Sequence, residues 1–329
     1  MAYERIQVRR LAGALGAEIS GVDLTRPVDD PTRKEIHDAW MEHQVLFLRG
    51  QQITREQHKD FARGFGELHV HAVLRQLESE GHPEIVVLES NEKQRYVADA
   101  WHSDVTFERK PPMGSILRAV VAPDYGGDTL WASMYAAWEA LSDSMQRLLS
   151  GLRARHAGDF FNYIAKDDQK KELAKDNGAV HPVIRTHPVT GRKGIFVNST
   201  FTKSIEGMKP AESRALLDFL YEHVSQPDFS VRFHWEPDSI AMWDNRCTQH
   251  CVLNDFEGDR VIQRVTIMGD KPQAAAAPRW RPLIGPMSAT SRHDRQLQEH
   301  LRTHDDDGAR LGRNPDSFLE AGQAKKGGR

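Results

Sequence analysis

The sequence is poor in cysteine and has no long apolar segment. Its 329 residues include two cysteines, Cys247 and Cys251, which are too few for a disulfide framework and favour a reducing environment. No apolar run approaches the roughly 18 residues of a membrane-spanning helix. The N-terminal stretch MAYERIQVRRLAG lacks the apolar core of a signal peptide. We therefore expect a cytoplasmic protein that does not enter a membrane.

The sequence also lacks a strong charge imbalance and a nucleotide-binding glycine motif. Its formal net charge of −3 does not favour nucleic acid or a membrane surface as a partner. No glycine-rich dinucleotide motif follows a predicted strand, and helices do not alternate regularly with strands, which argues against a doubly wound parallel fold. Hydrophobic residues make up 39% of the chain, enough for a sizeable core.

Predicted strands dominate the first 272 residues, with a few helices between them. Periodicity and capping signals predict helices from Pro31, from Thr54 (with Thr54 and Gln57 as a capping box), over 133–152 and over 211–224. Strands are predicted over 44–50, 82–90, 101–107, 114–123, 125–133 and 229–235, from Ser239 and from Arg260, with a hairpin over 183–198. This pattern predicts a mainly β fold with flanking helices, as an antiparallel barrel or double sheet.

The last part of the sequence differs from the rest. Residues 273–329 are polar and rich in glycine, proline and charge. We predict an exposed helix near 290–303 and disorder over about the last 20 residues. The chain is thus expected to have one domain, 1–272, and a C-terminal extension, 273–329, that is partly disordered or serves as an assembly arm.

Two histidines and an aspartate form a candidate metal site. In WHSDVTF, residues 101–107, a strand would point His102 and Asp104 to the same side. His250, at the end of a strand–turn segment in WDNRCTQHC, is the best candidate for a third ligand. Two imidazoles and a carboxylate with open positions make the facial triad of non-haem Fe(II) oxygenases, whereas structural zinc sites close four positions. A plain hydrogen-bonded pair is the alternative for His102 and Asp104, and the flanking cysteines are interpreted as ordinary buried thiols.

Two arginines follow the third candidate ligand. Arg260 and Arg264, in GDRVIQRVTIMGD, are four residues apart and share a face of a strand. Buried guanidinium groups need anionic partners and hold carboxylate or sulfonate well. Two such groups beside a metal imply two anions, a cosubstrate and a substrate. The alternative is that both arginines are surface residues of an edge strand.

Several spaced motifs resemble one enzyme family. The stretches WHSDVTF, GGDTLWAS, VIRTHPVTGRKGIFVN and WDNRCTQH through RVTIMGDKP are similar to those of the taurine dioxygenase family of Fe(II)/2-oxoglutarate-dependent oxygenases. The resemblance runs from about Val8 to Pro272. It implies a double-stranded β-helix, or jelly roll, with flanking helices, and it implies Fe(II), 2-oxoglutarate and O2 as cofactors and cosubstrates.

The resemblance also implies roles for individual residues. His102, Asp104 and His250 match the iron ligands, which makes them the predicted catalytic centre. Thr129 and Arg260 match the groups that bind 2-oxoglutarate, and Trp243 matches an aromatic position grouped with them. Arg264 and His71 match groups that hold the anionic head of the substrate, and Phe201 matches an aromatic position lining the substrate pocket.

Two departures from the taurine-specific pattern concern the substrate. Leu74 stands where taurine-specific members have a tyrosine, and Ala98 stands where they have an asparagine. An ammonium group would be left unpaired in the more apolar pocket, which disfavours taurine. We expect a small organic anion such as an alkylsulfonate or alkyl sulfate; the alternative is an aryloxyalkanoate of the phenoxypropionate type.

The implied reaction hydroxylates the carbon next to the heteroatom and releases sulfite, sulfate or a phenol together with an aldehyde or ketone. Two other classes of function remain possible on the residues alone: a zinc hydrolase with the same three ligands, and a non-catalytic metal-binding sensor module. Fe(II)-dependent consumption of 2-oxoglutarate would separate the oxygenase from both. The resemblance further implies a homo-oligomer, either a dimer or a tetramer.

Overall fold

The computed structural model describes residues 3–95, 98–159, 161, 165–173 and 178–274. The predicted C-terminal extension lies outside these ranges except for Gln273 and Ala274, and so does the helix predicted near 290–303. In the described part of the chain, no helix is both long enough and apolar enough to cross a membrane.

Two β-sheets form the centre of the molecule. The larger sheet has seven strands in the order β1-β2-β3-β13-β5-β15-β4, and the smaller has three in the order β12-β6-β14. Neighbouring strands are antiparallel except β2 and β3. The strands of the larger sheet are β1 Gln7–Arg10, β2 Ala17–Ser20, β3 Val45–Leu48, β4 Ile85–Ser90, β5 Gly114–Val121, β13 Ile240–Asp244 and β15 Arg260–Ile267; those of the smaller are β6 Thr129–Ser133, β12 Ser230–Phe233 and β14 Thr248–Val252.

The larger sheet is covered on both faces, so every residue of its central strand β13 is buried. Ile240 and Met242 of β13 pack in an outer core together with residues of helices α1 (Asp30–His43) and α2 (Arg55–Arg63). Ala241 and Trp243 of the same strand point the other way, into an inner core shared with the smaller sheet. The two facing sheets confirm the predicted jelly roll.

The predicted start of α2 is confirmed. Oγ1 of Thr54 accepts a hydrogen bond from the Gln57 N–H (3.2 Å), and Oε1 of Gln57 accepts one from the Thr54 N–H (2.7 Å). This capping box satisfies two amide groups at the end of the helix that have no partner within the helix.

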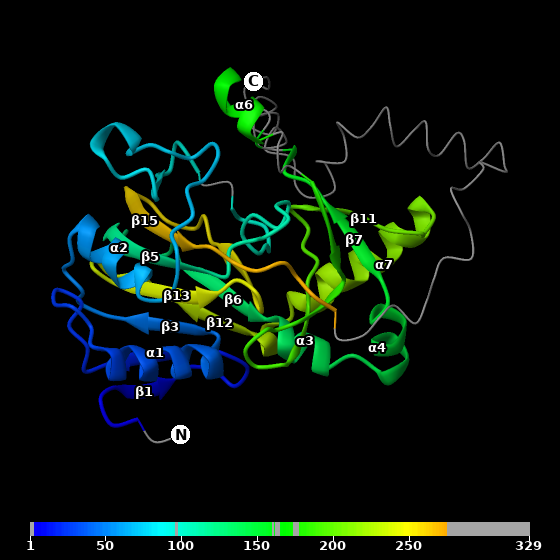
Figure 1. The fold of residues 1–329 in the computed structure, drawn as a ribbon, viewed down its shortest axis with the longest axis horizontal. Coiled ribbons are helices and arrows are strands. Elements are labelled where there is room, and N and C mark those ends of the chain that lie inside the picture. Colours follow the sequence, from blue (N-terminus) through cyan, green and yellow to red (C-terminus); the bar gives the residue numbers. More distant parts are fainter. Residues whose placement is uncertain (1–2, 96–97, 160, 162–164, 174–177, 275–329) are drawn as a thin grey trace, which may run out of the picture.

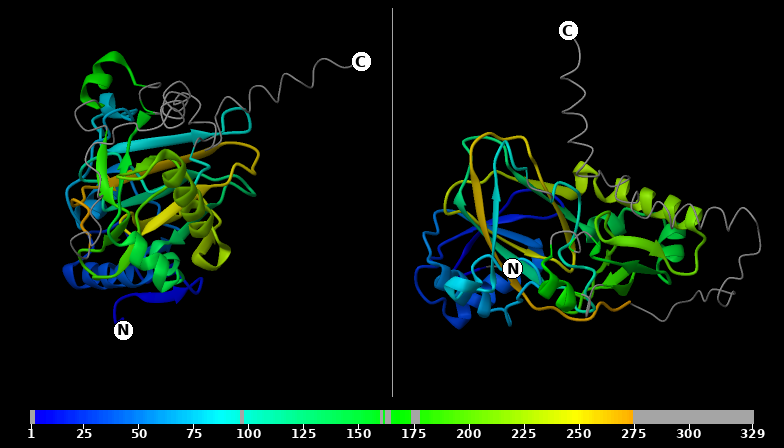
Figure 2. Two further views of the ribbon diagram at one scale, coloured as in Figure 1. Left: turned by 90° about the vertical axis from the view of Figure 1, so that its right-hand side faces the viewer. Right: turned by 90° about the horizontal axis from the view of Figure 1, so that it is seen from above.

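A second group of elements lies beside the two sheets. Figure 1 shows β7, β11 and α7 on one side of the molecule and β3, β13, β5 and β15 on the other. The elements of this group are the sheet β11-β7-β8 (β7 Arg153–His156, β8 Ala179–Pro182, β11 Thr202–Ile205), the hairpin β9 Ile184–Thr186 and β10 Lys193–Ile195, and the helices α3 Met134–Glu139, α4 Asp143–Leu149, α6 Asp167–Leu173 and α7 Pro210–Val224. Figure 2 shows α7, in yellow-green, lying along the outside of this group. Two short 3₁₀ turns, η1 Glu78–Glu80 and η2 Pro227–Phe229, complete the described elements.

The sequence predictions are wrong at two points in this region. The single helix predicted over 133–152 is two helices, α3 and α4, because the Ser142 hydroxyl accepts from the Met145 N–H (3.3 Å) and starts a new helix there. The strands β7, β8 and β11 were not predicted, whereas the hairpin over 183–198 is confirmed as β9 and β10.

Candidate active site

His102 and His250 are held side by side by their own backbones. The His102 N–H donates to the His250 carbonyl (3.0 Å), and the His250 N–H donates to the His102 carbonyl (2.8 Å). The two ring centroids are 4.1 Å apart. His250 is the central residue of β14, so its predicted place at the end of a strand–turn segment is wrong. The backbone pairing joins two imidazoles that are distant in the sequence.

The segment that carries Asp104 turns back and does not continue as a strand. The strand predicted over 101–107 is therefore wrong: His102 forms an isolated bridge, and a turn begins at Asp104. Val105 has a φ of 54°. Oδ1 of Asp104 nevertheless lies 3.8 Å from Nε2 of His102, and the ligand atoms of His102, Asp104 and His250 all lie within 4.8 Å of one another. The three candidate ligands thus converge through a turn.

The protonation states of these residues suit a divalent metal. Nδ1 of His102 lies 2.8 Å from the Ala100 carbonyl, so Nδ1 carries the proton and Nε2 keeps its lone pair toward Asp104. Burial lowers the pKa of His102 and lowers that of His250 to about 3. Burial alone would raise the pKa of Asp104, but the charge of Arg264 holds it well below its usual range. Two neutral imidazoles and an ionised carboxylate are metal ligands as they stand.

The donor set fits Fe(II). Nδ1 of His250 is buried without a hydrogen-bond partner among the described residues. This is unusual, because most buried polar groups have a partner. No fourth histidine, cysteine or carboxylate in the described ranges joins the group. Two nitrogen ligands, one oxygen ligand and open positions match a facial triad, not a closed zinc site.

Strand β15 directs two arginines into the same cavity. Ile262 belongs to the inner core, so Arg260 and Arg264, two residues before and after it, also face the space between the sheets. Both line the cavity that contains His102 and His250, which excludes the surface-strand alternative. Nη2 of Arg260 lies 3.5 Å from Oγ1 of Thr129, and Nη1 of Arg264 donates to Oδ1 of Asp104 (2.8 Å).

His71 presents a buried N–H group in the region of Arg264. Its Nδ1 accepts from the backbone N–H groups of Val73 and Leu74, each at 3.0 Å, so the proton is on Nε2. Burial, and next the charge of Arg264, lower the pKa of His71 to about 3. Nε2 of His71 and Nε of Arg264 are both buried and without a partner among the described residues. Two unsatisfied donors in one region can hold an anion.

The remaining predicted residues form apolar walls. Ala98 and Trp243 line the cavity, and the Trp243 ring centroid is 4.8 Å from that of His250. The Phe201 ring is 6.4 Å from the His102 ring, in an apolar cluster against which the half-buried Leu74 packs. The structure therefore brings the predicted site residues into one region. Of these, His71, Leu74, Phe201 and Asp104 are not among the residues that line the cavity itself.

Three residues that the sequence analysis missed support the candidate ligands. Ser115 donates from Oγ to Oδ2 of Asp104 (3.1 Å). The Trp131 ring stacks on the His250 ring, with centroids 6.5 Å apart. The side chain of Asn245 bonds the backbone of Asp104. Alternation along β5 and β6 could have placed Ser115 and Trp131 on the inner face, but no local pattern marks Asn245.

Comparison with known proteins identifies the family. Residues 7–266 match the family described as taurine catabolism dioxygenase TauD, TfdA family. The chain belongs to this family. It is 36% identical over 279 residues to an alkylsulfatase of Acinetobacter baylyi, covering 81% of this chain and 86% of the relative. It is 35% identical over 278 residues to an alpha-ketoglutarate-dependent sulfate ester dioxygenase of Pseudomonas putida, covering 81% and 91%.

A solved structure supports the same family assignment. The crystal structure of a taurine dioxygenase from Burkholderia xenovorans superimposes with a TM-score of 0.72 at 38% sequence identity, over 83% of this chain and 92% of that one. The resemblance drawn from the motifs and the predicted jelly roll are both confirmed. Membership of the TauD, TfdA family also makes the chain an oxidoreductase of the dioxygenase type.

A second buried cluster in this TauD, TfdA family chain is a structural brace and not a metal site. Ligand atoms of His187, Asp244 and Cys247 lie within 4.8 Å of one another. Nδ1 of His187 accepts from two backbone N–H groups, and Nε2 donates to Asp244 (2.9 Å), so the ring offers no lone pair. Burial raises the pKa of the Cys247 thiol well above its usual range. Cys247 and Cys251 are both buried thiols outside any disulfide bond, as predicted.

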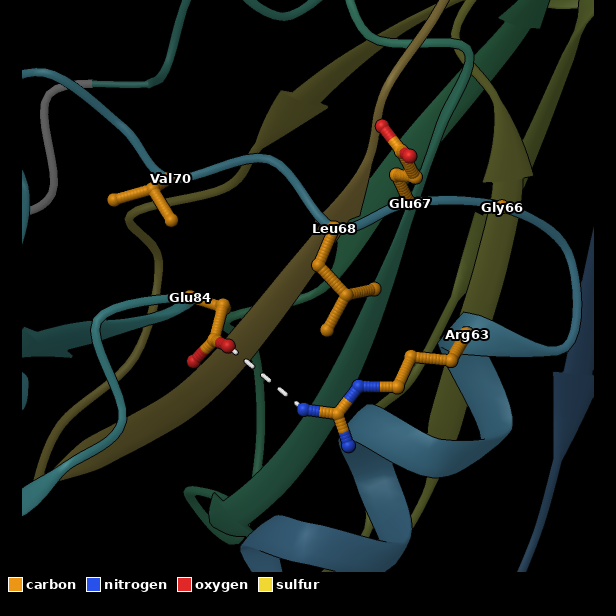
Figure 3. Close-up of a pocket in the computed structure, with 6 residues that line it drawn as sticks. All are labelled: Arg63, Gly66, Glu67, Leu68, Val70 and Glu84. Atoms are coloured by element: carbon orange, nitrogen blue, oxygen red, sulfur yellow. Dashed lines mark ion pairs between the residues drawn. The ribbon is translucent and has the colours of Figure 1, made fainter.

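A surface hollow lies apart from the candidate ligands. Figure 3 shows it between the end of α2 and the strands beside it, with Arg63 pointing toward Glu84; the two are paired at 3.8 Å. It shares no lining residue with the cavity at His102 and His250, and no described metal-ligand group lies in it. The candidate metal ligands therefore lie at the cavity between the sheets and not at this hollow.

Proposed function

We propose that the chain is an Fe(II)- and 2-oxoglutarate-dependent dioxygenase that hydroxylates the carbon next to the heteroatom of a small organic anion, with an alkyl sulfate or alkylsulfonate as substrate. The observation that carries this proposal is the convergence of the ligand atoms of His102, Asp104 and His250 at a cavity that the two histidines line together with two arginines. In this proposal His102, Asp104 and His250 hold the iron. Similarity to an alkylsulfatase and to a sulfate ester dioxygenase supports the substrate class.

The cosubstrate end of the cavity is assigned to Arg260 and Thr129. Both line the cavity, and Arg260 is 1% exposed, so an anion beside it would be poorly screened by water. A guanidinium and a hydroxyl suit the distal carboxylate of 2-oxoglutarate. Arg260 also donates from Nε to the Gly127 carbonyl (3.1 Å), which fixes the direction of its guanidinium. Trp243 forms the aromatic wall beside His250.

The substrate end is assigned to His71 and Arg264. Their buried Nε2–H and Nε–H groups supply donors for a sulfate or sulfonate head. Leu88, Ala98, Leu117 and Val252 line the cavity and suit an alkyl chain. Among the described lining residues there is no carboxylate to pair with an ammonium group. This supports an apolar anion in preference to taurine, because burying an unpaired charge is costly.

The proposed reaction divides the two oxygen atoms of O2 between 2-oxoglutarate and the organic anion. Bound Fe(II) supplies the redox chemistry that lets dioxygen react with two organic molecules. One oxygen atom of O2 enters 2-oxoglutarate, which loses its C1 carboxylate as CO2 and becomes succinate. The other is inserted into the C–H bond next to the ester oxygen or the sulfur. The new hydroxyl loses its proton, a C=O bond forms, and sulfate or sulfite leaves with the bonding electron pair.

The chain's own side chains have three tasks in this reaction. Ser115 and Arg264 hold the two carboxylate oxygens of Asp104. The backbone pairing of His102 with His250 sets the distance between the imidazoles. His71 and Arg264 place the substrate's anionic head at one side of the metal, so that the carbon next to the heteroatom is the one oxidised.

We also infer that the enzyme works in the cytoplasm on a small molecule, without a nucleic acid or membrane partner. Two buried cysteines that form no disulfide bond and a net charge of −3 support this inference. The expected dimer or tetramer stays a prediction, which light scattering of the purified protein would test.

A substrate panel tests the proposed function. The protein is incubated with Fe(II), ascorbate and 2-oxoglutarate, and succinate, sulfate, sulfite and phenol are measured. The panel contains hexyl sulfate, hexanesulfonate, taurine and both enantiomers of 2-phenoxypropionate. We expect succinate together with sulfate from hexyl sulfate or sulfite from hexanesulfonate, and little product from taurine. Preferred turnover of taurine would refute the pocket assignment, release of phenol would support the aryloxyalkanoate alternative, and no substrate-stimulated succinate would contradict the function.

A further inference from the structure

Asn245 bonds the turn that carries Asp104. Its side chain is fully buried and lies between β13 and β14. Oδ1 accepts from the Asp104 N–H (2.7 Å), while Nδ2 donates to the carbonyls of Asp104 (2.9 Å) and Pro112 (3.1 Å). A reversed amide would set its NH2 group against the Asp104 N–H, so the partners determine this orientation. One side chain therefore fixes the peptide groups on both sides of Asp104.

The backbone at this turn needs to be held. Val105 adopts a φ of 54°, which is unfavourable for a β-branched residue. Its peptide link to Asp104 contains the carbonyl that accepts from Nδ2 of Asn245. A strained backbone of this kind persists only where the surroundings enforce it. The Asn245 amide supplies that constraint from a distant part of the sequence.

The turn that carries Asn245 is itself braced. The preceding residue, Asp244, accepts from Nη2 of Arg246 (2.6 Å) and from Nε2 of His187 (2.9 Å). The Thr248 hydroxyl donates to the Asp244 carbonyl (2.8 Å), where β14 begins and leads to His250. Asn245 thus connects the segment of one candidate ligand to the strand of another through fixed contacts.

We propose that Asn245 is a positioning residue that sets the direction of the Asp104 carboxylate and thereby the affinity of the site for its metal. This inference rests on the proposed function, because it needs His102, Asp104 and His250 to bind a metal. Asn245 touches neither metal nor substrate in this proposal; it acts through the backbone of Asp104.

Metal binding in the absence of turnover tests the proposal. Mn(II) is titrated by calorimetry into the wild-type protein and into the variants Asn245→Ala, Asn245→Ser and Gln51→Ala. Gln51 is the matched control: its amide accepts from the Leu24 N–H (2.9 Å) and donates to the carbonyls of Val22 (3.2 Å) and Arg49 (3.0 Å). It makes three backbone hydrogen bonds, as Asn245 does, but none to a candidate ligand.

We expect Asn245→Ala to weaken Mn(II) binding by about 10–100-fold, the usual effect of removing a group that orients a metal ligand. Asn245→Ser should lose less Mn(II) affinity than Asn245→Ala, because the serine hydroxyl keeps a polar group in the turn. Gln51→Ala should lower the melting temperature yet leave the Mn(II) Kd within about twofold of wild type.

The outcomes separate this proposal from the proposed function. Wild-type protein that binds no Mn(II) would contradict the metal site itself. Wild-type affinity in folded Asn245→Ala, or an equal loss in Gln51→Ala, would overturn the positioning role. Failure of both Asn245 variants to fold while Gln51→Ala folds would assign Asn245 to folding alone, and would also overturn it.

Discussion

Replacing Arg260 with methionine should weaken the binding of 2-oxoglutarate and leave kcat nearly unchanged. Methionine keeps an apolar stem of similar length and removes the guanidinium. A hydrogen bond to a charged group contributes about 1.5–3 kcal/mol, and Arg260 is 1% exposed, so the upper part of that range applies. A loss of about 3 kcal/mol corresponds to a rise of about 100-fold in the KM for 2-oxoglutarate.

The kcat of Arg260→Met at saturating 2-oxoglutarate should stay near the wild-type value, because the distal carboxylate is held equally in the ground state and the transition state. Steady-state succinate formation measures both constants. Arg118→Met is the matched control: Arg118 lies on the neighbouring strand β5, pairs with Asp238 (2.7 Å) and does not line the cavity. A KM for Arg260→Met no different from that of Arg118→Met would refute the assignment of the cosubstrate end.

Three further predictions concern the pocket and the core. Thr129→Val removes one hydroxyl from the cosubstrate end and should raise the KM for 2-oxoglutarate by about fivefold, or about 1 kcal/mol; an unchanged KM would exclude Thr129 from binding. Phe201→Ala should raise the KM for hexyl sulfate more than that for ethyl sulfate, because each buried methylene contributes about 0.8 kcal/mol; equal changes would place the alkyl chain elsewhere. His58 is fully buried against the Ile116 carbonyl (3.0 Å), and burial lowers its pKa to about 4. The unfolded chain therefore binds this proton first, and stability falls as the pH drops from about 6.5 toward 4, by about 1.4 kcal/mol per pH unit for this group. His58→Gln should show a shallower slope of unfolding free energy against pH, and equal slopes in urea denaturation would contradict this.

Local patterns were sufficient for much of the fold. The capping box at Thr54 and the β-rich runs that start at Ser239 and Arg260 are short-range signals, and the structure contains the elements that they predict. The motifs also predicted that His102, Asp104 and His250 lie together, and their ligand atoms are within 4.8 Å of one another. Residues that face the same core within one strand repeat at a fixed period, which is why Arg260 and Arg264 could be placed on one face.

The errors come from interactions between distant segments. The turn at Asp104 depends on Asn245, which lies far along the chain, so the local sequence of WHSDVTF resembles a strand. The unpredicted strand β14 is buried at every position and therefore shows no alternation of apolar and polar residues. The helix predicted over 133–152 failed for a local reason, since Ser142 can either continue a helix or cap a new one.

The central claim is that His102, Asp104 and His250 hold the metal that drives coupled oxidation of 2-oxoglutarate and an apolar anion. The most direct test measures succinate and sulfate from hexyl sulfate in wild-type protein, in Asp104→Ala and in Asp99→Ala. Asp99 is a nearby aspartate outside the converging group. We predict equimolar succinate and sulfate from the wild type and Asp99→Ala, and none from a folded Asp104→Ala. Undiminished succinate formation by Asp104→Ala would contradict the assignment of the metal centre.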